Sequence, residues 1–120
     1  MVAYNFQPQF AEAISTWQKR QTIRALGKRR HARIGDALQL YTGQRTKECR
    51  KLLALDPPCT AVLPISIGLN GRMVEVFIDD VYVAQDQLEQ LAKDDGFNSV
   101  DEFIYFFESR LPFEGVIVKW

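Results

Sequence analysis

A turn signal in the second half of the chain constrains the fold more than any other feature of the sequence. Asn70-Gly71 separates Ile65-Ser66-Ile67 from the apolar and β-branched residues 73–78. Two-residue β-hairpin turns favour Asn-Gly because both residues reach positive backbone φ angles at low cost. The sequence therefore predicts an antiparallel hairpin across this turn.

Further strand signals recur between turns along most of the chain. Alternating and β-branched runs predict additional strands at residues 2–6, 22–24, 37–41, 49–55, 60–67 and 115–120. Pro64 lies inside one of these strands, and proline has no N–H to donate to a neighbouring strand. We therefore expect that strand to lie at a sheet edge or to contain a bulge.

Three segments show the helical period instead. Apolar residues three and four apart predict helices at residues 8–17, 86–96 and 100–110. Gly96 suits the position after a helix C-terminus, and Ser99 with Glu102 has the spacing of a capping box. We expect the phenylalanines of the last helix to lie in the core. Trp17, at the end of the first helix, is predicted to lie in the core or in the wall of a cleft.

The length and composition indicate one folded domain. A chain of 120 residues, 47% of them apolar and 25% charged, has the proportions of an ordinary globular protein with a substantial core. No repeat, linker or low-complexity segment divides it. Many short strands and tight turns predict an α+β fold, mainly β, in which a small antiparallel barrel is flanked by about three helices.

Charge is distributed unevenly along the chain, although the formal net charge is zero. Residues 1–60 have a net charge of +7, and residues 61–120 have −7. This division favours a basic face that binds an anionic partner, backed by an acidic face. The alternative is that both halves are simply solvated and fold onto each other.

Cysteine and histidine give no sign of a metal centre. Cys49 and Cys59 lack metal-ligand spacing and are predicted to be structural thiols in a reducing cytoplasm. His31 lies among Arg and Lys residues, and we expect it to be exposed and able to contact phosphate. We expect no metal and no cofactor. The N-terminus shows no signal-peptide pattern, and no apolar run approaches the roughly 20 residues of a membrane span, which favours a soluble cytoplasmic protein without membrane association. The oligomeric state stays open.

The segment Lys19-Arg20-Gln21-Thr22-Ile23-Arg24 concentrates the chemistry of the chain. In an extended strand, side chains two apart share a face, which places Arg20, Thr22 and Arg24 together. A turn or bulge at Arg20 or Gln21 would bring Lys19 into the same cleft.

These residues suit two kinds of function. A Thr22 hydroxyl becomes a nucleophile if a base takes its proton, and Lys19 could be that base if nearby Arg20 and Arg24 lower its pKa. Arg24 could stabilise an oxyanion or bind a phosphate. Alternatively, Tyr41 could stack on a base while a set of cations follows a phosphate backbone. That set comprises Lys19, Arg20, Arg24, Lys28, Arg29, Arg30, Arg33, Arg45 and Lys47.

The same residues carry a family resemblance. Lys19-x-x-Thr22-x-Arg24, the basic loop, Gly35-Asp36-x-Leu38-x-Leu40-Tyr41-Thr42-Gly43 and Arg45-Thr46 together resemble the ASCH domain family, small β-barrels of the PUA-like superfamily. Asp94-Asp95-Gly96-Phe97 and Ser99–Phe103 resemble its late helical segment. The resemblance spans nearly the whole chain, residues 1–120 forming a single ASCH domain. Trp17 stands where the family motif has glycine, so we expect an altered turn before Lys19.

The resemblance implies handling of RNA, a nucleotide or a nucleoside. ASCH domains are generally proposed to bind RNA, one branch removes the acetyl group from N4-acetylcytidine, and another member is described as a ribonuclease. The amidohydrolase set of Lys, Thr and an acid corresponds to Lys19, Thr22 and Asp95, with Asp94 as the second possibility for the acid. Asp95 would protonate the leaving amine. A different alternative is a non-catalytic protein-interaction module that uses the basic loop 25–33.

Overall fold

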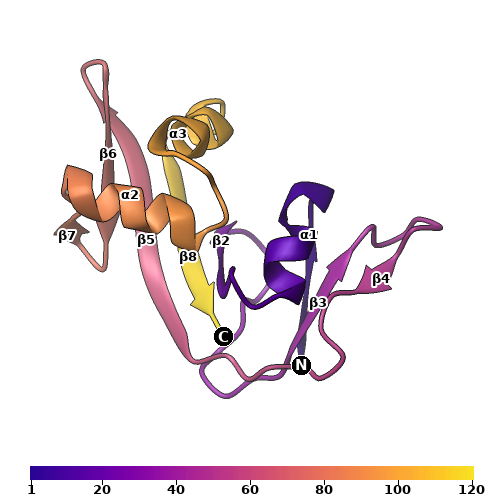
Figure 1. Cartoon of the computed structure of the whole chain (residues 1–120). Helices are drawn as coiled ribbons and strands as arrows, with labels where there is room; N and C mark the ends of the chain where they lie inside the picture. The colour runs from indigo at the N-terminus through magenta and orange to yellow at the C-terminus, as the bar shows by residue number, and fades with distance from the viewer.

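The computed structural model describes all 120 residues and contains two sheets and three helices (Figure 1). The first sheet has the strand order β1 (Val2–Phe6), β3 (Leu38–Thr42), β4 (Arg50–Lys51), with β1 and β3 parallel. The second sheet is antiparallel throughout, with the order β2 (Gln21–Ala25), β8 (Phe113–Lys119), β5 (Ala61–Asn70), β6 (Met73–Ile78), β7 (Val81–Tyr82).

The α+β, mainly β character of the prediction is confirmed, but neither sheet closes on itself to form a barrel. Strands β2 and β7 remain the edges of the five-stranded sheet, and β1 and β4 those of the other. The two sheets share no ladder of paired strands, because the chain between them runs through irregular segments such as residues 26–37 and 52–60. No helix is long and apolar enough to cross a membrane.

The predicted hairpin is confirmed as β5 and β6. Asn70 pairs with Met73, so the two turn residues are Gly71 and Arg72, one position later than the Asn-Gly signal placed them. Gly71 has a φ of 62°, in the left-handed region. Glycine adopts this backbone conformation at a lower energetic cost than other residues, because it has no Cβ.

The expectation for Pro64 is wrong for the strand as a whole, because β5 lies between β8 and β6. It is right locally. Strand β6 ends at Ile78, opposite Ile65, so Pro64 has no β6 residue beside it, and its carbonyl accepts a hydrogen bond from the Asp79 amide at 2.9 Å. The missing N–H therefore falls just beyond the end of the neighbouring strand, where no ladder bond is lost.

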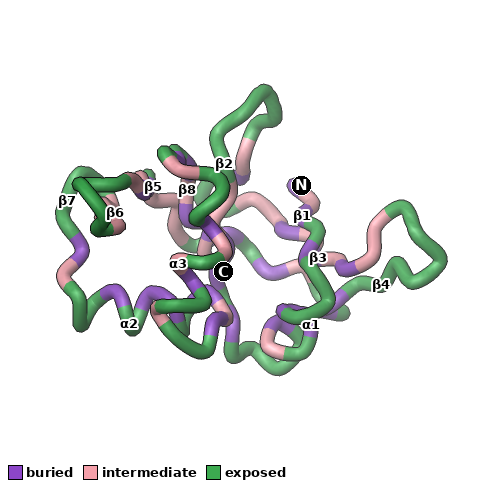
Figure 2. Tube along the Cα trace, turned by 90° about the horizontal axis from the view of Figure 1, so that it is seen from above, coloured by how far each residue is buried: buried purple, intermediate pink, exposed green.

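All three helices lie on one side of the strands, and the loop between β2 and β3 extends on the other side (Figure 2). They are α1 (Pro8–Ser15), α2 (Gln85–Asp94) and α3 (Val100–Glu108), which confirms the three predicted segments. Helix α2 ends with Gly96 at a φ of 93°, where Gly96 and Phe97 donate to the carbonyls of Lys93 and Ala92. This is a Schellman motif, and it turns the chain sharply after Asp95.

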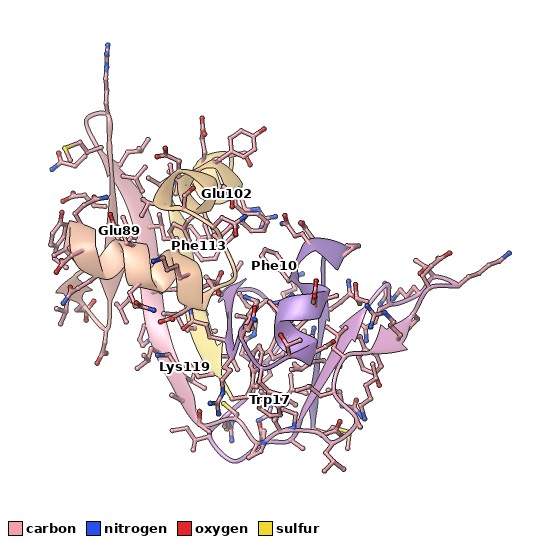
Figure 3. All side chains as sticks on the ribbon, in the orientation of Figure 1. Phe10, Trp17, Glu89, Glu102, Phe113 and Lys119 are labelled. Carbon is pink, nitrogen blue, oxygen red and sulfur yellow. The ribbon has the colours of Figure 1, made fainter.

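An aromatic cluster joins the two halves of the molecule. Ring centroids 5.0–6.2 Å apart connect Phe10, Phe97, Phe103, Phe106, Phe107 and Phe113. Phe10 comes from α1, whereas the others come from the last third of the chain, and Figure 3 shows Phe10 on the α1 side facing that part. Phe103 and Phe107 are buried as predicted, and Phe106 is half-buried.

Two local predictions are wrong. Of the strand expected at 49–55, only Arg50–Lys51 forms, because Leu52 and Leu53 pack into the core from an irregular segment. Trp17 is not a core residue, since it is 47% exposed, and it lines neither of the two cavities described below; it contacts Arg20, whose guanidinium lies 5.4 Å from the ring centroid. Its φ is 65°, so the tryptophan adopts the backbone conformation that glycine would favour at this place.

Candidate functional site

An irregular turn between α1 and β2 places Lys19 in the site. The Lys19 amide donates to the Ala13 carbonyl at 2.9 Å, and β2 begins only at Gln21. The turn carries the Lys19 side chain inward, where it is 2% exposed. The turn occupies residues 16–18, ahead of Lys19, and not Arg20 or Gln21 as the sequence suggested, but it does bring Lys19, Thr22 and Arg24 to one pocket.

This inner pocket has a volume of about 300 Å³. Its charged lining residues are Lys19, Arg24, Asp95 and Arg110, and its aromatic ones are Phe6, Phe10, Phe97, Phe106 and Phe107. The lining comes from β1, α1, β2, the turn after α2 and the region around α3, so it exists only in the folded chain. No three His, Cys, Asp or Glu side chains gather in an arrangement that could hold a metal ion.

Lys19 and Asp95 form a buried ion pair at the end of this pocket. Lys19 Nζ donates to Asp95 Oδ1 at 3.2 Å and to the Asp95 backbone carbonyl at 2.5 Å. Gln21 Nε2 donates to the same carboxylate oxygen at 3.4 Å. Asp95 Oδ2 makes no hydrogen bond within the protein, which leaves one oxygen of a 95%-buried carboxylate for a ligand.

Burial moves both groups of this pair towards their neutral forms. Desolvation lowers the pKa of Lys19, although the Asp95 charge and hydrogen bond oppose the shift, and Arg24 lowers it further. Desolvation likewise raises the pKa of Asp95 against the effect of Lys19. The direction predicted for Lys19 is therefore correct, but burial rather than neighbouring arginines is its main cause.

Thr22 is held by Arg24 rather than by Lys19. Arg24 Nε donates to Thr22 Oγ1 at 3.0 Å, and Arg24 Nη2 donates to the Asn5 carbonyl at 2.7 Å. The guanidinium also lies over the rings of Tyr4 and Phe6, with its carbon 5.0 and 4.7 Å from their centroids. Burial lowers the pKa of Arg24 to about 10. Because Thr22 Oγ1 accepts this bond, its own proton remains available for donation.

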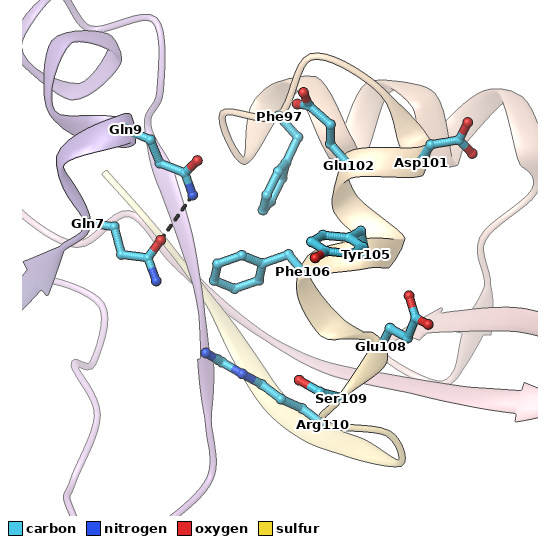
Figure 4. A pocket seen from close by; sticks show the side chains of 10 residues that line it. All are labelled: Gln7, Gln9, Phe97, Asp101, Glu102, Tyr105, Phe106, Glu108, Ser109 and Arg110. Atoms are coloured by element: carbon cyan, nitrogen blue, oxygen red, sulfur yellow. Dashed lines mark hydrogen bonds between the residues drawn. The ribbon is translucent and has the colours of Figure 1, made fainter.

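A second, wider cavity adjoins the inner pocket. This outer groove has a volume of about 1060 Å³ and shares Gln7, Phe97, Phe106 and Arg110 with the inner pocket. Figure 4 shows Gln7 and Gln9 on one side of it, with Phe106 and Arg110 extending towards them from α3 and the chain after it. The groove also contains Asp101, Glu102 and Glu108, so its charged residues are mostly acidic.

Most of the predicted ligand-binding residues lie outside both cavities. Of the binding set, only Arg24 lines the inner pocket, and Arg20, Lys28, Arg29, Arg30, Arg33, Tyr41 and Arg45 do not. Arg29 instead donates to the Ala3 carbonyl, and Arg30 forms an ion pair with Asp36 at 3.4 Å. Of the two acids considered, Asp95 lines the pocket, whereas Asp94 is exposed and accepts a hydrogen bond from Gln90 at 2.7 Å.

His31 is half-buried rather than exposed as the sequence suggested, and both of its ring nitrogens have partners within the protein. Its Nε2 lies 2.8 Å from the Ala25 carbonyl, and its Nδ1 lies 3.0 Å from the Tyr4 hydroxyl. The Ala32 amide donates to the same hydroxyl at 3.1 Å. His31 therefore pairs through Nε2 with the Ala25 carbonyl and through Nδ1 with the Tyr4 hydroxyl, so it fastens the basic loop to β1.

Several residues at or beside the two cavities have no signature in the sequence. Gln21 is buried beside Asp95, and Gln7 and Phe106 connect the two cavities, yet none of them belongs to a motif. Arg110 is the one such residue that the sequence could have singled out, because only four Lys or Arg residues occur in the acidic half of the chain, residues 61–120. The chain matches no protein-family model, no curated protein and no solved structure, so the ASCH resemblance rests on the motifs around Lys19 and Arg45 and stays a prediction.

Proposed function

We propose that the protein is an ASCH-type, PUA-like amidohydrolase that removes an acyl group from the exocyclic amine of a modified pyrimidine, such as N4-acetylcytosine in a nucleoside, nucleotide or RNA. The observation that carries the proposal is the meeting of Lys19, Thr22 and Asp95 in one aromatic-lined pocket, although 76 residues separate Lys19 from Asp95. Carboxyl, amine and hydroxyl groups together supply the acid, base and nucleophile of acyl transfer.

The size and walls of the inner pocket suit a single planar ring. A volume of about 300 Å³ is at the lower end of the range for ligand pockets. Phe6, Phe10, Phe97 and Phe106 provide apolar surface and aromatic faces against which a base can pack. A base placed there would bring its exocyclic amide near Thr22 and Asp95.

Burial lowers the pKa of Lys19 and raises the pKa of Asp95, and these are the directions that amide hydrolysis needs. Neutral Lys19 accepts the proton of the Thr22 hydroxyl as Thr22 Oγ1 forms a bond to the acyl carbon. The C–N bond then breaks, and the neutral Asp95 carboxyl gives its proton to the leaving nitrogen. Water hydrolyses the acyl ester: Asp95 accepts a proton from the water, Lys19 returns its proton to Thr22, and the free acid leaves. Before the first of these steps, Lys19 Nζ must leave its hydrogen bond with Asp95 Oδ1 and accept one from the Thr22 hydroxyl.

The test is hydrolysis of N4-acetylcytidine by the purified protein, followed as formation of cytidine. Thr22→Val retains the shape of the side chain and removes the hydroxyl, so kcat/KM should fall at least about a hundredfold. Thr22→Ser is the matched control, which retains a hydroxyl and should retain most of the activity. Absence of turnover by folded wild-type protein, or full activity of Thr22→Val, would refute the proposal.

A second candidate function is RNA binding by the basic loop. Lys28 and Arg33 are exposed, neither side chain forms an ion pair, and the loop extends away from the helices (Figure 2). Binding of this kind weakens steeply with salt, because each phosphate contact releases a counterion. A Lys28→Ala/Arg33→Ala variant should lower RNA affinity and reduce the salt dependence, and an unchanged slope would exclude the loop as the contact.

A further inference from the structure

A third cavity lies between α2 and the five-stranded sheet, and we call it the α2 cavity. Its volume is about 370 Å³, and it shares no lining residue with the inner pocket or the outer groove. Helix α2 crosses the strands from β7 towards β2 (Figure 1). All five strands contribute to the lining, through Gln21, Ile117, Lys119, Leu63, Ile78 and Val81. The α2 cavity therefore extends across the sheet, along the helix.

The two ends of the α2 cavity differ in polarity. Ile78 and Val81 line the end next to β6 and β7. Gln21 and Lys119 line the other end, on β2 and β8, and Asp94 is the last residue of α2 at the same end. A ligand that fills the cavity therefore needs an apolar body and a polar head, with the head next to β2.

Gln21 and Lys119 both retain a polar atom without a partner. They are paired in the β2–β8 register, which places their side chains next to each other on one face of the sheet. Gln21 is only 4% exposed, its Nε2 donates to Asp95 Oδ1, and its Oε1 makes no hydrogen bond within the protein. Lys119 Nζ forms no ion pair. On the helix side, by contrast, Gln90 and Asp94 are hydrogen-bonded to each other. The cavity thus presents a free acceptor beside a free donor.

We propose that the α2 cavity is a second ligand site, which binds a small uncharged molecule with an amide head and an apolar body. The N–H of the head donates to Gln21 Oε1, and its carbonyl accepts from Lys119 Nζ, so the donor and acceptor of one amide meet the two free atoms. A neutral head suits this end, because Lys119 and Asp94 carry opposite charges. The body lies against Leu63 and Ile78, whose burial from water supplies the apolar part of the affinity.

The α2 cavity is separate from the proposed catalytic pocket. Neither Lys19 nor Thr22 lines it, so an amide bound there is not placed for hydrolysis, and the inference does not depend on the proposed function. Gln21 nevertheless connects the two sites, because its Nε2 contacts Asp95. A ligand on Gln21 Oε1 therefore contacts the same amide group that holds the Asp95 carboxylate, and the side-chain N–H resonances of Gln21 report its binding directly.

The test is a titration of ¹⁵N-labelled protein with 3-phenylpropanamide, followed through the N–H resonances. We expect a Kd of about 1 mM for a ligand of this size, with shifts of the Gln21 side chain and the Leu91 backbone amide. The matched compounds 3-phenylpropanoate and 3-phenylpropylamine each lack one of the two hydrogen bonds, because a carboxylate has no donor and an ammonium has no acceptor. Each should bind about fivefold more weakly.

Two variants test the role of Lys119. Lys119→Met retains an apolar stem and removes the donor, so binding of 3-phenylpropanamide should weaken about fivefold. Lys93→Met is the matched control, since Lys93 is exposed on α2 and does not line the cavity, and it should leave the affinity unchanged.

Three results would overturn the inference. Equal binding of the three compounds would show that the head is not recognised. Absence of shifts at about tenfold the expected Kd, or shifts confined to inner-pocket residues such as Phe10, would show that the cavity is not the site. Shifts of the same resonances when the protein is concentrated without ligand would show that a second copy of the chain occupies the cavity. None of these results depends on whether N4-acetylcytidine is hydrolysed.

Discussion

The buried Lys19–Asp95 pair should show strong energetic coupling in a double-mutant cycle. Its side chains are 2% and 6% exposed, and 3.2 Å separates Nζ from Oδ1. Asp95→Asn removes the counter-charge and leaves a buried ammonium, which typically costs about 3–5 kcal/mol. The backbone carbonyl of Asp95 still accepts from Lys19. We therefore expect a loss near the lower end, about 3 kcal/mol.

Lys19→Met should cost less, about 2 kcal/mol, because Asp95 can take up a proton and retain its bond from Gln21. The double variant contains no buried charge at this position, so its loss should be smaller than the sum of the two single losses by about 2 kcal/mol. Urea unfolding at pH 7 measures all four free energies, and about 3 kcal/mol corresponds to a midpoint shift of about 2 M. Additive losses would refute the reasoning. Asp56→Asn, in the more exposed pair with Lys51, is the control and should shift the midpoint far less.

The pH dependence of these variants provides an independent check. The pKa of Lys19 is lowered from 10.5, so the folded state disfavours the proton and stability increases as pH rises towards 10.5. Asp95→Asn removes the carboxylate that raises the pKa of Lys19. The loss of unfolding free energy of this variant relative to the wild type should therefore become smaller between pH 7 and 10. The pKa of Asp95 is raised from 3.8 in the folded protein. The protonated carboxyl therefore contributes to the free energy of unfolding fully below pH 3.8, and this contribution is lost as pH rises through the pKa of the folded state. The deficit of Lys19→Met should therefore grow with pH.

Three further predictions concern stability. Trp17→Gly should raise stability by about 1 kcal/mol in thermal unfolding, because it relieves a φ of 65°, whereas Trp17→Ala retains that strain and should bring no gain. Gly96→Ala should cost more than Gly71→Ala in urea unfolding, since both have positive φ but only the Gly96 Cβ would come 2.9 Å from a carbon of Lys19; equal losses would contradict this crowding. Phe103→Ala, at a fully buried position, should lose about 3–5 kcal/mol, and a loss below about 1 kcal/mol would show that the aromatic cluster repacks.

Local sequence signals predicted most elements of the fold. The hairpin at Asn70-Gly71, the end of α2 near Gly96 and the start of α3 at Ser99 depend on neighbouring residues, so they can be recognised without knowledge of the rest of the chain. The Lys19–Arg24 segment was identified for the same reason, since it is dense in reactive groups. Leu52-Leu53 misled the prediction, because an apolar run marks burial and not the backbone conformation that achieves it.

The sequence by itself determined the three helices and most of the strands and turns, and also which segment carries the amine and hydroxyl of the site. Only the tertiary structure decided that Asp95 meets Lys19, that Arg24 holds Thr22, and that a wider groove adjoins the pocket. The physical reason is the distance along the chain over which each kind of interaction acts. Turn and capping preferences act over a few residues, whereas the pairing of distant groups depends on how the aromatic cluster packs two halves of the chain together, which no local pattern specifies.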